Sequence, residues 1–136
     1  MALTLLLGGA GAGKSRLAVR LAAARGVPVV VVATAEPGDR EMEERIRRHR
    51  AARPASWVTV EEPVDLEGAL RSVPDGALAL VDCLTLWVSN LVHRGAPDRE
   101  VLRRAGRAAG LAAARPGGTI AVTNEVGSGI VPANPL

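Results

Sequence analysis

The segment from Gly8 to Ser15, GGAGAGKS, matches the pattern G-x-x-x-x-G-K-[ST] between an apolar stretch and a helical one. Glycines there let main-chain N–H groups turn toward phosphate oxygens, and the start of the next helix adds positive potential. Lys14 is the only lysine among 17 lysines and arginines, and a compact ammonium suits the β- and γ-phosphates. The Ser15 hydroxyl is a suitable Mg²⁺ ligand. The segment predicts a nucleotide-binding loop rather than an accidental glycine-rich turn.

A second candidate is Asp82, which lies toward the carboxyl end of the apolar stretch of residues 77–85. In open α/β sheets, ligands bind at the carboxyl ends of the strands, and an acid there commonly lies near Mg²⁺. The alternative is a strand-end aspartate that caps a turn. Thr34, Asn124 and Glu125 also follow apolar stretches, although each alone is also typical of a turn.

The segment from Arg40 to Arg50 predicts a helix in which glutamates precede arginines. This order complements the helix dipole, and the spacing predicts Glu–Arg pairs at 41–45, 43–47 and 44–48. Paired arginines on a solvated face argue against a basic arm for nucleic acid.

His49 lies seven residues after Met42 and three after Ile46, which places it on the inward stripe of this helix. Two interpretations are open at this point. A lone histidine on such a stripe is commonly a packed core residue, but a neutral imidazole is also a competent nucleophile toward phosphorus. Arg53, just before Pro54, is then the best candidate to stabilise a departing pyrophosphate.

Apolar stretches alternate with helical ones, which predicts an α/β fold with a mostly parallel sheet and one domain over residues 1–136. The first apolar stretch is too short to span a membrane and predicts a buried strand. The helix after it is expected to turn Leu17, Leu21 and Ala24 inward and to stop at Gly26. Cys83 and Trp87 are expected in the core. The expected strands are 3–7, 28–35, 77–85 and 119–125, and the helices are 14–25, 40–50 and 98–115.

Composition limits the function classes. With one cysteine there is no disulfide framework, which favours a cytoplasmic protein. A net charge of +3 and a pI near 10.4 keep a nucleic-acid-binding module as one hypothesis. Against it, the chain has two tryptophans and no Phe or Tyr, too few aromatic rings for a base-stacking platform. A simple P-loop small-molecule kinase is another alternative.

Several segments together resemble the bifunctional adenosylcobinamide kinase / adenosylcobinamide-phosphate guanylyltransferase family of cobalamin biosynthesis. They occur in the family's order and cover nearly the whole chain. The matching segments are GGAGAGKS, VATAE, EMEERIRRHRAARP, WVTVEEP, LVDCLTLWVSNL and VTNEVGSGIVP.

The resemblance implies a RecA-like P-loop fold with Mg²⁺, ATP and GTP, and no nucleic acid or membrane span. The implied enzyme phosphorylates adenosylcobinamide with ATP or GTP, then transfers GMP from GTP to that phosphate through a GMP–histidine. A homo-oligomer, with a trimer as one candidate, is also implied. Carried over, His49 and Lys14 are catalytic, and Ser15 and Asp82 hold Mg²⁺. The implied nucleotide-binding residues are Gly8, Gly9, Ala10, Gly11, Ala12, Gly13, Lys14, Ser15, Thr34, Ala35, Arg53, Glu61 and Asp82, with Glu62 as the alternative to Glu61.

The chain departs from the family pattern in three places. Gly11 and Ala12 stand where the family often has Arg-Ser, which removes a possible phosphate contact. Arg48 stands where a second histidine can occur, so His49 is the single candidate nucleophile. The family continues past the VP motif with a further helix and strand, so the chain is expected to be C-terminally truncated.

Overall fold

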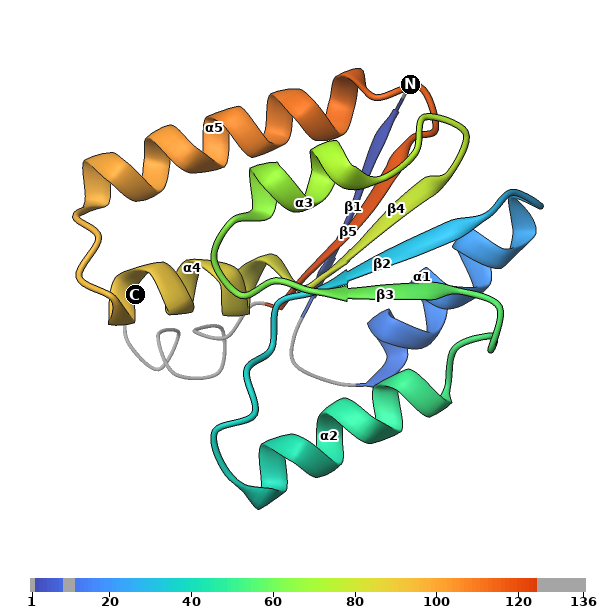
Figure 1. Cartoon of the computed structure of the whole chain (residues 1–136), viewed down its shortest axis with the longest axis horizontal. Helices are drawn as coiled ribbons and strands as arrows, with labels where there is room; N and C mark the ends of the chain where they lie inside the picture. Colours follow the sequence, from blue (N-terminus) through green and yellow to red (C-terminus); the bar gives the residue numbers. More distant parts are fainter. Residues whose placement is uncertain (1, 9–11, 125–136) are drawn as a thin grey trace.

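A computed structural model describes residues 2–8 and 12–124, which form five strands and five helices, with two consecutive helices before the last strand (Figure 1). The elements are β1 Leu3–Gly8, α1 Ala12–Ala24, β2 Val29–Ala33, α2 Arg40–Ala51, β3 Val58–Glu61, α3 Leu66–Ser72, β4 Leu78–Asp82, α4 Leu84–His93, α5 Asp98–Ala114 and β5 Thr119–Asn124.

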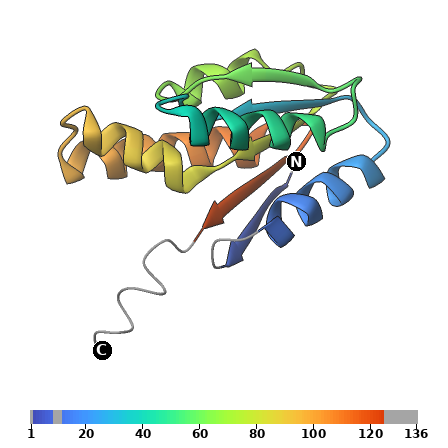
Figure 2. The same ribbon diagram turned by 90° about the horizontal axis from the view of Figure 1, so that it is seen from below.

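The strands form one sheet in the order β1-β5-β4-β2-β3, and every described pair is parallel. The prediction of an α/β fold with a parallel sheet is confirmed. Figure 2 shows β1 and β5 side by side, ending at the same edge. Leu6 of β1 and Asp82 of β4 both align with Val122 of β5, so β1 and β4 end at nearly the same level.

The core has two halves, one on each face of the sheet, because successive strand side chains point to opposite faces. In β2, Val30 and Val32 face a cluster that includes buried residues of α3, α4 and α5. Val29 and Val31 face the other cluster, which α1 covers. Both faces of β2 are therefore covered, which explains its uninterrupted run of valines.

The prediction that Leu17, Leu21 and Ala24 form the inward face of α1 was wrong. Ala18 and Ala22 are buried, whereas Leu17 and Leu21 are 37% and 38% exposed. The two alanines lie four residues apart on one face, and their small side chains let the helix approach the sheet closely. Gly26, with φ of +67°, follows the helix end as predicted, in the left-handed conformation that favours glycine.

The prediction that the first strand is buried was also wrong. In the described part of the chain, β1 is an edge strand that pairs with β5 alone. Leu5 and Leu7 are 49% and 63% exposed as a result. None of the described helices is both long and apolar enough to cross a bilayer.

The predicted strand 77–85 is shorter than expected, because β4 ends at Asp82. Cys83 is the N-cap of α4, and Thr85 lies in its first turn. Cys83 and Trp87 are 2% and 1% exposed, which confirms their prediction as core residues.

Candidate functional site

Asp82 is the centre of a charged cluster at the carboxyl edge of the sheet. Its Oδ2 lies 3.4 Å from His49 Nδ1 and 3.4 Å from Arg53 Nη2. His49 and Arg53 lie 33 and 29 residues before Asp82 in the sequence, and the β2–α2–β3 crossover brings both to the end of β4. The structure thus brings Asp82 together with His49 and Arg53, which the sequence nominated from a different segment.

The electrostatics of the cluster favour an ionised carboxylate. Burial raises the pKa of Asp82, but the hydrogen bond with His49 and the charges of His49 and Arg53 outweigh it, so the pKa is lowered. Burial lowers the pKa of Arg53, and the nearby Asp82 opposes this effect. The Arg53 side chain is 7% exposed, and no described residue forms a hydrogen bond with its buried Nη1. Arg53 is therefore a largely buried cation anchored by one carboxylate.

The helix α2 presents His49 at its basic end. Asp39 caps the helix, because its Oδ1 accepts a hydrogen bond of 2.8 Å from the Met42 N–H. Met42, Ile46 and His49 are half-buried, so the predicted inward stripe exists, but no residue of α2 is fully buried. The His49 side chain is 42% exposed, which does not fit an enclosed core residue and leaves the ring accessible to a ligand.

The arginine face of α2 differs in detail from the prediction. The ion pair within this helix joins Glu44 to Arg47, three residues apart. The predicted pairs at four-residue spacing do not form among the described residues of α2. Such exposed pairs contribute little, about 0.3–0.5 kcal/mol each, so either pairing is accessible to the helix.

Thr34 lies inside the fold at the end of β2. It is fully buried, and its hydroxyl donates to the Cys83 carbonyl at 2.7 Å and accepts from the Cys83 N–H at 2.8 Å. Asn90 of α4, which the sequence did not single out, donates to the carbonyls of Thr34 and Pro63, both at 2.9 Å. These bonds hold the chain next to Asp82 in place. Ala35 follows and is half-buried.

The structure distinguishes Glu61 from Glu62. The Glu62 carboxylate accepts hydrogen bonds from the N–H groups of Val64 and Asp65, at 3.1 and 2.9 Å, and thereby stabilises the turn before α3. Glu61 is exposed and lies 3.6 Å from Arg50 Nη1. Glu61 therefore remains available to a ligand. It borders a hollow of about 280 Å³ whose other lining residues are Pro37, Glu43, Ile46, Arg47 and Arg50.

The phosphate-loop segment begins where β1 ends. The Lys14 side chain folds back over Gly8, where an added Cβ would lie 3.3 Å from Lys14 Cδ and 3.6 Å from Nζ. The ammonium thus lies over the carboxyl end of β1. Ala12, Gly13 and Ser15 belong to the first turn of α1. Gly9, Ala10, Gly11 and Glu125 lie outside the described residues, and β5 ends at Asn124.

The proposed Mg²⁺ ligands are one hydroxyl and one carboxylate. Within residues 2–8 and 12–124, no group of three or more His, Cys, Asp or Glu side chains is arranged to hold a metal ion. Mg²⁺ in nucleotide-binding sites takes one or two protein carboxylates, together with water and substrate phosphates. Ser15 and the partly exposed Asp82 fit that requirement.

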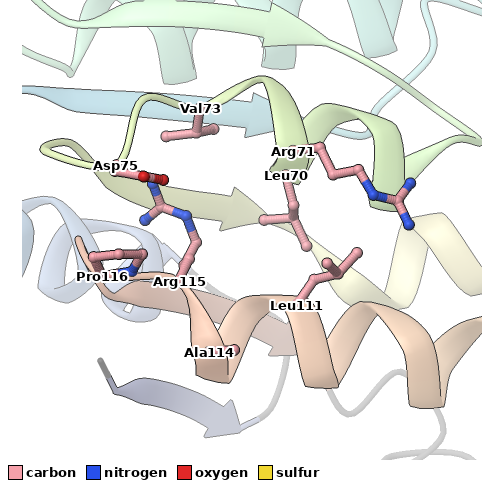
Figure 3. Close-up of a pocket in the computed structure, with 8 residues that line it drawn as sticks. All are labelled: Leu70, Arg71, Val73, Asp75, Leu111, Ala114, Arg115 and Pro116. Carbon is pink, nitrogen blue, oxygen red and sulfur yellow. The ribbon is translucent and has the colours of Figure 1, made fainter.

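A second hollow of about 280 Å³ lies between α3 and α5, with Asp75 and Arg115 at one end of it (Figure 3). Arg115 donates hydrogen bonds to the carbonyls of Pro74 and Gly118, which lie in the turns before β4 and β5. This hollow is therefore at the amino edge of the sheet, opposite Asp82. We interpret Arg115 as structural, because its donors close the two turns.

Comparison with known proteins gives consistent results. The family model described as cobinamide kinase / cobinamide phosphate guanyltransferase matches residues 4–136. A bifunctional adenosylcobalamin biosynthesis protein, CobP, of Pseudomonas aeruginosa is 50% identical over 133 residues, covering 97% of this chain and 76% of that protein. The bifunctional adenosylcobalamin biosynthesis proteins CobU of Salmonella typhimurium and Escherichia coli are 37% and 34% identical, each covering 97% of this chain and 80% of its own length.

Proposed function

The chain belongs to the cobinamide kinase / cobinamide phosphate guanyltransferase family, and from that premise we propose that it catalyses two successive transfers. The first phosphorylates adenosylcobinamide with ATP or GTP. The second transfers GMP from GTP to that phosphate, through a GMP–histidine, to give adenosylcobinamide-GDP. The observation that carries the proposal is the meeting of His49, Asp82 and Arg53 at the edge of the sheet where the phosphate loop begins.

In the kinase step, the loop from Gly8 to Ser15 holds the triphosphate. Lys14, folded over the end of β1, neutralises charge that develops on the transferred phosphoryl group. Mg²⁺ would be held by Ser15 and Asp82 together with phosphate oxygens, and it would supply further neutralisation. Since β5 separates β1 from β4 in the sheet, their ends are about 10 Å apart, a distance that one bound nucleotide can bridge.

In the guanylyl step, a neutral nitrogen of His49 attacks the α-phosphorus of GTP. The bond from the α-phosphorus to the bridging oxygen breaks, and pyrophosphate leaves with the electron pair. Arg53, a largely buried cation beside Asp82, is positioned to stabilise this leaving group. A covalent step divides one difficult transfer into two easier ones. Glu61, Thr34 and Ala35 complete the proposed nucleotide site, Thr34 as support for the chain next to Asp82.

Two further features belong to the same proposal. The reactions take place in the cytoplasm, where the single buried thiol of Cys83 remains reduced. The chain forms a homo-oligomer, with a trimer as one candidate, and light scattering at several concentrations measures its mass.

The decisive experiment incubates the protein with α-labelled GTP and then denatures it. Label should remain on the wild-type chain and should be labile in acid and stable in base, as expected for an N–P bond. His49→Ala should abolish labelling and guanylyl transfer while sparing the phosphorylation of adenosylcobinamide. His93→Ala is the matched control, because His93 is the other histidine and its ring forms its described hydrogen bonds with Ser89 of its own helix. Covalent labelling of His49→Ala, or equal loss of the kinase step, would overturn the assignment.

A further inference from the structure

The two ring nitrogens of His49 have different surroundings. Nδ1 faces Asp82 Oδ2 at 3.4 Å. No described residue forms a hydrogen bond with Nε2, and the side chain is 42% exposed. One nitrogen is thus turned to the protein and the other is accessible. The distance is long for a hydrogen bond, as is common for catalytic pairs before substrate binds.

Asp82 is well placed to fix the ring, because the chain around it is itself fixed. Its carbonyl accepts a hydrogen bond of 3.0 Å from the Thr34 N–H. The next residue, Cys83, is bonded at both main-chain groups by the Thr34 hydroxyl. The buried guanidinium of Arg53 also lies 3.4 Å from the Asp82 carboxylate, at the same oxygen, Oδ2, that faces His49. The carboxylate that faces Nδ1 therefore has little freedom to turn away.

We propose that Asp82 is a positioning residue for guanylyl transfer: it holds the proton of the neutral His49 ring on Nδ1, so that Nε2 carries the lone pair and receives the GMP. The nitrogen that bears the proton is set by the hydrogen bond that it makes, and a carboxylate acceptor at Nδ1 selects the Nδ1–H form. The inference rests on the proposed function, in which His49 is the nucleophile. It adds a role for Asp82 that is independent of Mg²⁺.

The chemical steps balance with this arrangement. The Nε2 lone pair forms the bond to the α-phosphorus, and pyrophosphate leaves with the electrons of the broken P–O bond. The proton stays on Nδ1, so the guanylylated ring is cationic and the Asp82 carboxylate neutralises it. An oxygen of adenosylcobinamide phosphate then attacks the same phosphorus, and the N–P electron pair returns to Nε2. No oxidant or additional proton donor is needed.

The first test needs neither nucleotide nor Mg²⁺. Nitrogen-15 NMR of the histidine rings is recorded near pH 8.5, about two units above the ordinary histidine pKa. Wild-type His49 should show the Nδ1–H form. In Asp82→Asn the new amide N–H group can donate to Nδ1, and the ring should shift to the Nε2–H form. His93, whose Nδ1 lies 2.8 Å from the Ser89 carbonyl, is an internal control that should stay Nδ1–H in both proteins. A wild-type His49 in the Nε2–H form would overturn the inference.

The second test identifies the modified nitrogen in the wild-type protein. Protein labelled with α-labelled GTP is digested in base, and the Nδ1 and Nε2 isomers of the labelled histidine are separated. Label on Nε2 supports the inference, and label on Nδ1 refutes it while leaving His49 as nucleophile. Absence of label from His49 would defeat the proposed function and, with it, the role of Asp82 in guanylyl transfer, whereas the NMR measurement would still report whether Asp82 holds the proton on Nδ1. In Asp82→Asn, guanylylation should fall by about 100-fold or more; an unchanged rate would also refute the inference.

Discussion

At the scale of single residues, Lys14 and Asp82 each place a charge at the carboxyl edge of the sheet. Lys14 covers the end of β1, and Asp82 ends β4. The two proposed transfers use the same triphosphate-binding loop, so one cation near the phosphates serves both. A nucleophilic histidine, in contrast, serves only guanylyl transfer.

Lys14→Ala should therefore lose both activities, each by about 10²- to 10³-fold, the usual cost of removing one group that stabilises transition-state charge. The fold should survive, because Lys14 is not buried. The measurement is GTP affinity, kinase rate and guanylylation of purified protein. Arg20→Ala, which removes an exposed cation from the same helix, controls for net charge. Wild-type GTP affinity and turnover in Lys14→Ala would refute the shared site.

The lowered pKa of Asp82 predicts how stability changes with pH. The folded pKa lies below the unfolded value of about 3.9, so the ionised form stabilises the native state. This contribution is complete above the unfolded pKa and is lost as the pH falls through the lower folded pKa. Urea unfolding of wild type and Asp82→Asn should show a stability difference at pH 6 that shrinks below pH 4. A difference that is constant from pH 7 to pH 3 would contradict the pairing with His49 and Arg53.

The residue types of the site were readable from the sequence, but their contacts were not. The spacing of the glycines and the single lysine in GGAGAGKS is enough to indicate a phosphate-binding loop, so the loop could be predicted from the sequence alone. His49 and Asp82 are 33 residues apart, and their approach depends on the path of a crossover. The choice between Glu61 and Glu62 was also open, because adjacent residues of a strand differ only in the face that they present.

At the scale of elements, α2 is distinctive because it carries the proposed nucleophile, His49, without a buried residue of its own. Figure 1 shows it at the lower margin of the molecule, apart from α3, α4 and α5. Its described side-chain contacts with the body run from His49 to Asp82 and from Arg50 to Glu61. Arg53, two residues beyond the end of the helix, pairs with the same Asp82 carboxylate. The end of β3 thus contributes both to this attachment, through Glu61, and to the start of α3, through Glu62.

The adjacent glutamates at the end of β3 should therefore give opposite results. Glu62→Gln should lower stability by about 1 kcal/mol, because it weakens two hydrogen bonds to main-chain N–H groups before α3. It should leave guanylylation nearly unchanged. Glu61→Gln should leave stability within about 0.5 kcal/mol and weaken GTP binding, since a carboxylate suits the N–H groups of guanine. Urea unfolding and GTP titration of Glu61→Gln and Glu62→Gln test this prediction. If both variants change stability and GTP affinity equally, the two glutamates do not have separate roles.

Long periodic elements were predicted well, and short ones were missed. The helices α2 and α5 agree with their predicted ranges to within a residue or so, because charge order and alanine content mark their ends. The short elements β3 and α3 were not predicted, because four and seven residues give too little periodicity. The helix α4 was not predicted from the sequence. Its apolar residues follow β4 almost directly, so the strand and the helix form one continuous apolar stretch in the sequence.

At the scale of the whole molecule, the carboxyl and amino ends of the strands form two edges of the sheet with different roles. The carboxyl edge carries the charged cluster at Asp82. The amino edge is closed by the turns before β4 and β5, which Arg115 joins (Figure 3). The order of the strands in the sheet could not be predicted from the sequence. Buried parallel strands are all apolar, so their residues do not indicate which strand lies next to which.

This division predicts that the amino edge sets stability and leaves the chemistry unchanged. At Gly117, an added Cβ would lie 1.9 Å from the Ala77 carbonyl oxygen, a main-chain atom that cannot move aside easily. Gly117→Ala should therefore destabilise the protein by about 1–3 kcal/mol. Gly110, exposed in the middle of α5 with open space around it, is the matched control, and Gly110→Ala should stabilise by about 0.5–1 kcal/mol.

Both glycine variants should retain the wild-type rate of labelling by α-labelled GTP at temperatures where they are folded, because neither position touches the cluster at Asp82. Thermal unfolding and labelling of the two proteins, measured side by side, test this. Loss of labelling in folded Gly117→Ala would mean that the two edges are coupled. The carboxyl-edge geometry would then depend on how tightly the turns before β4 and β5 are closed.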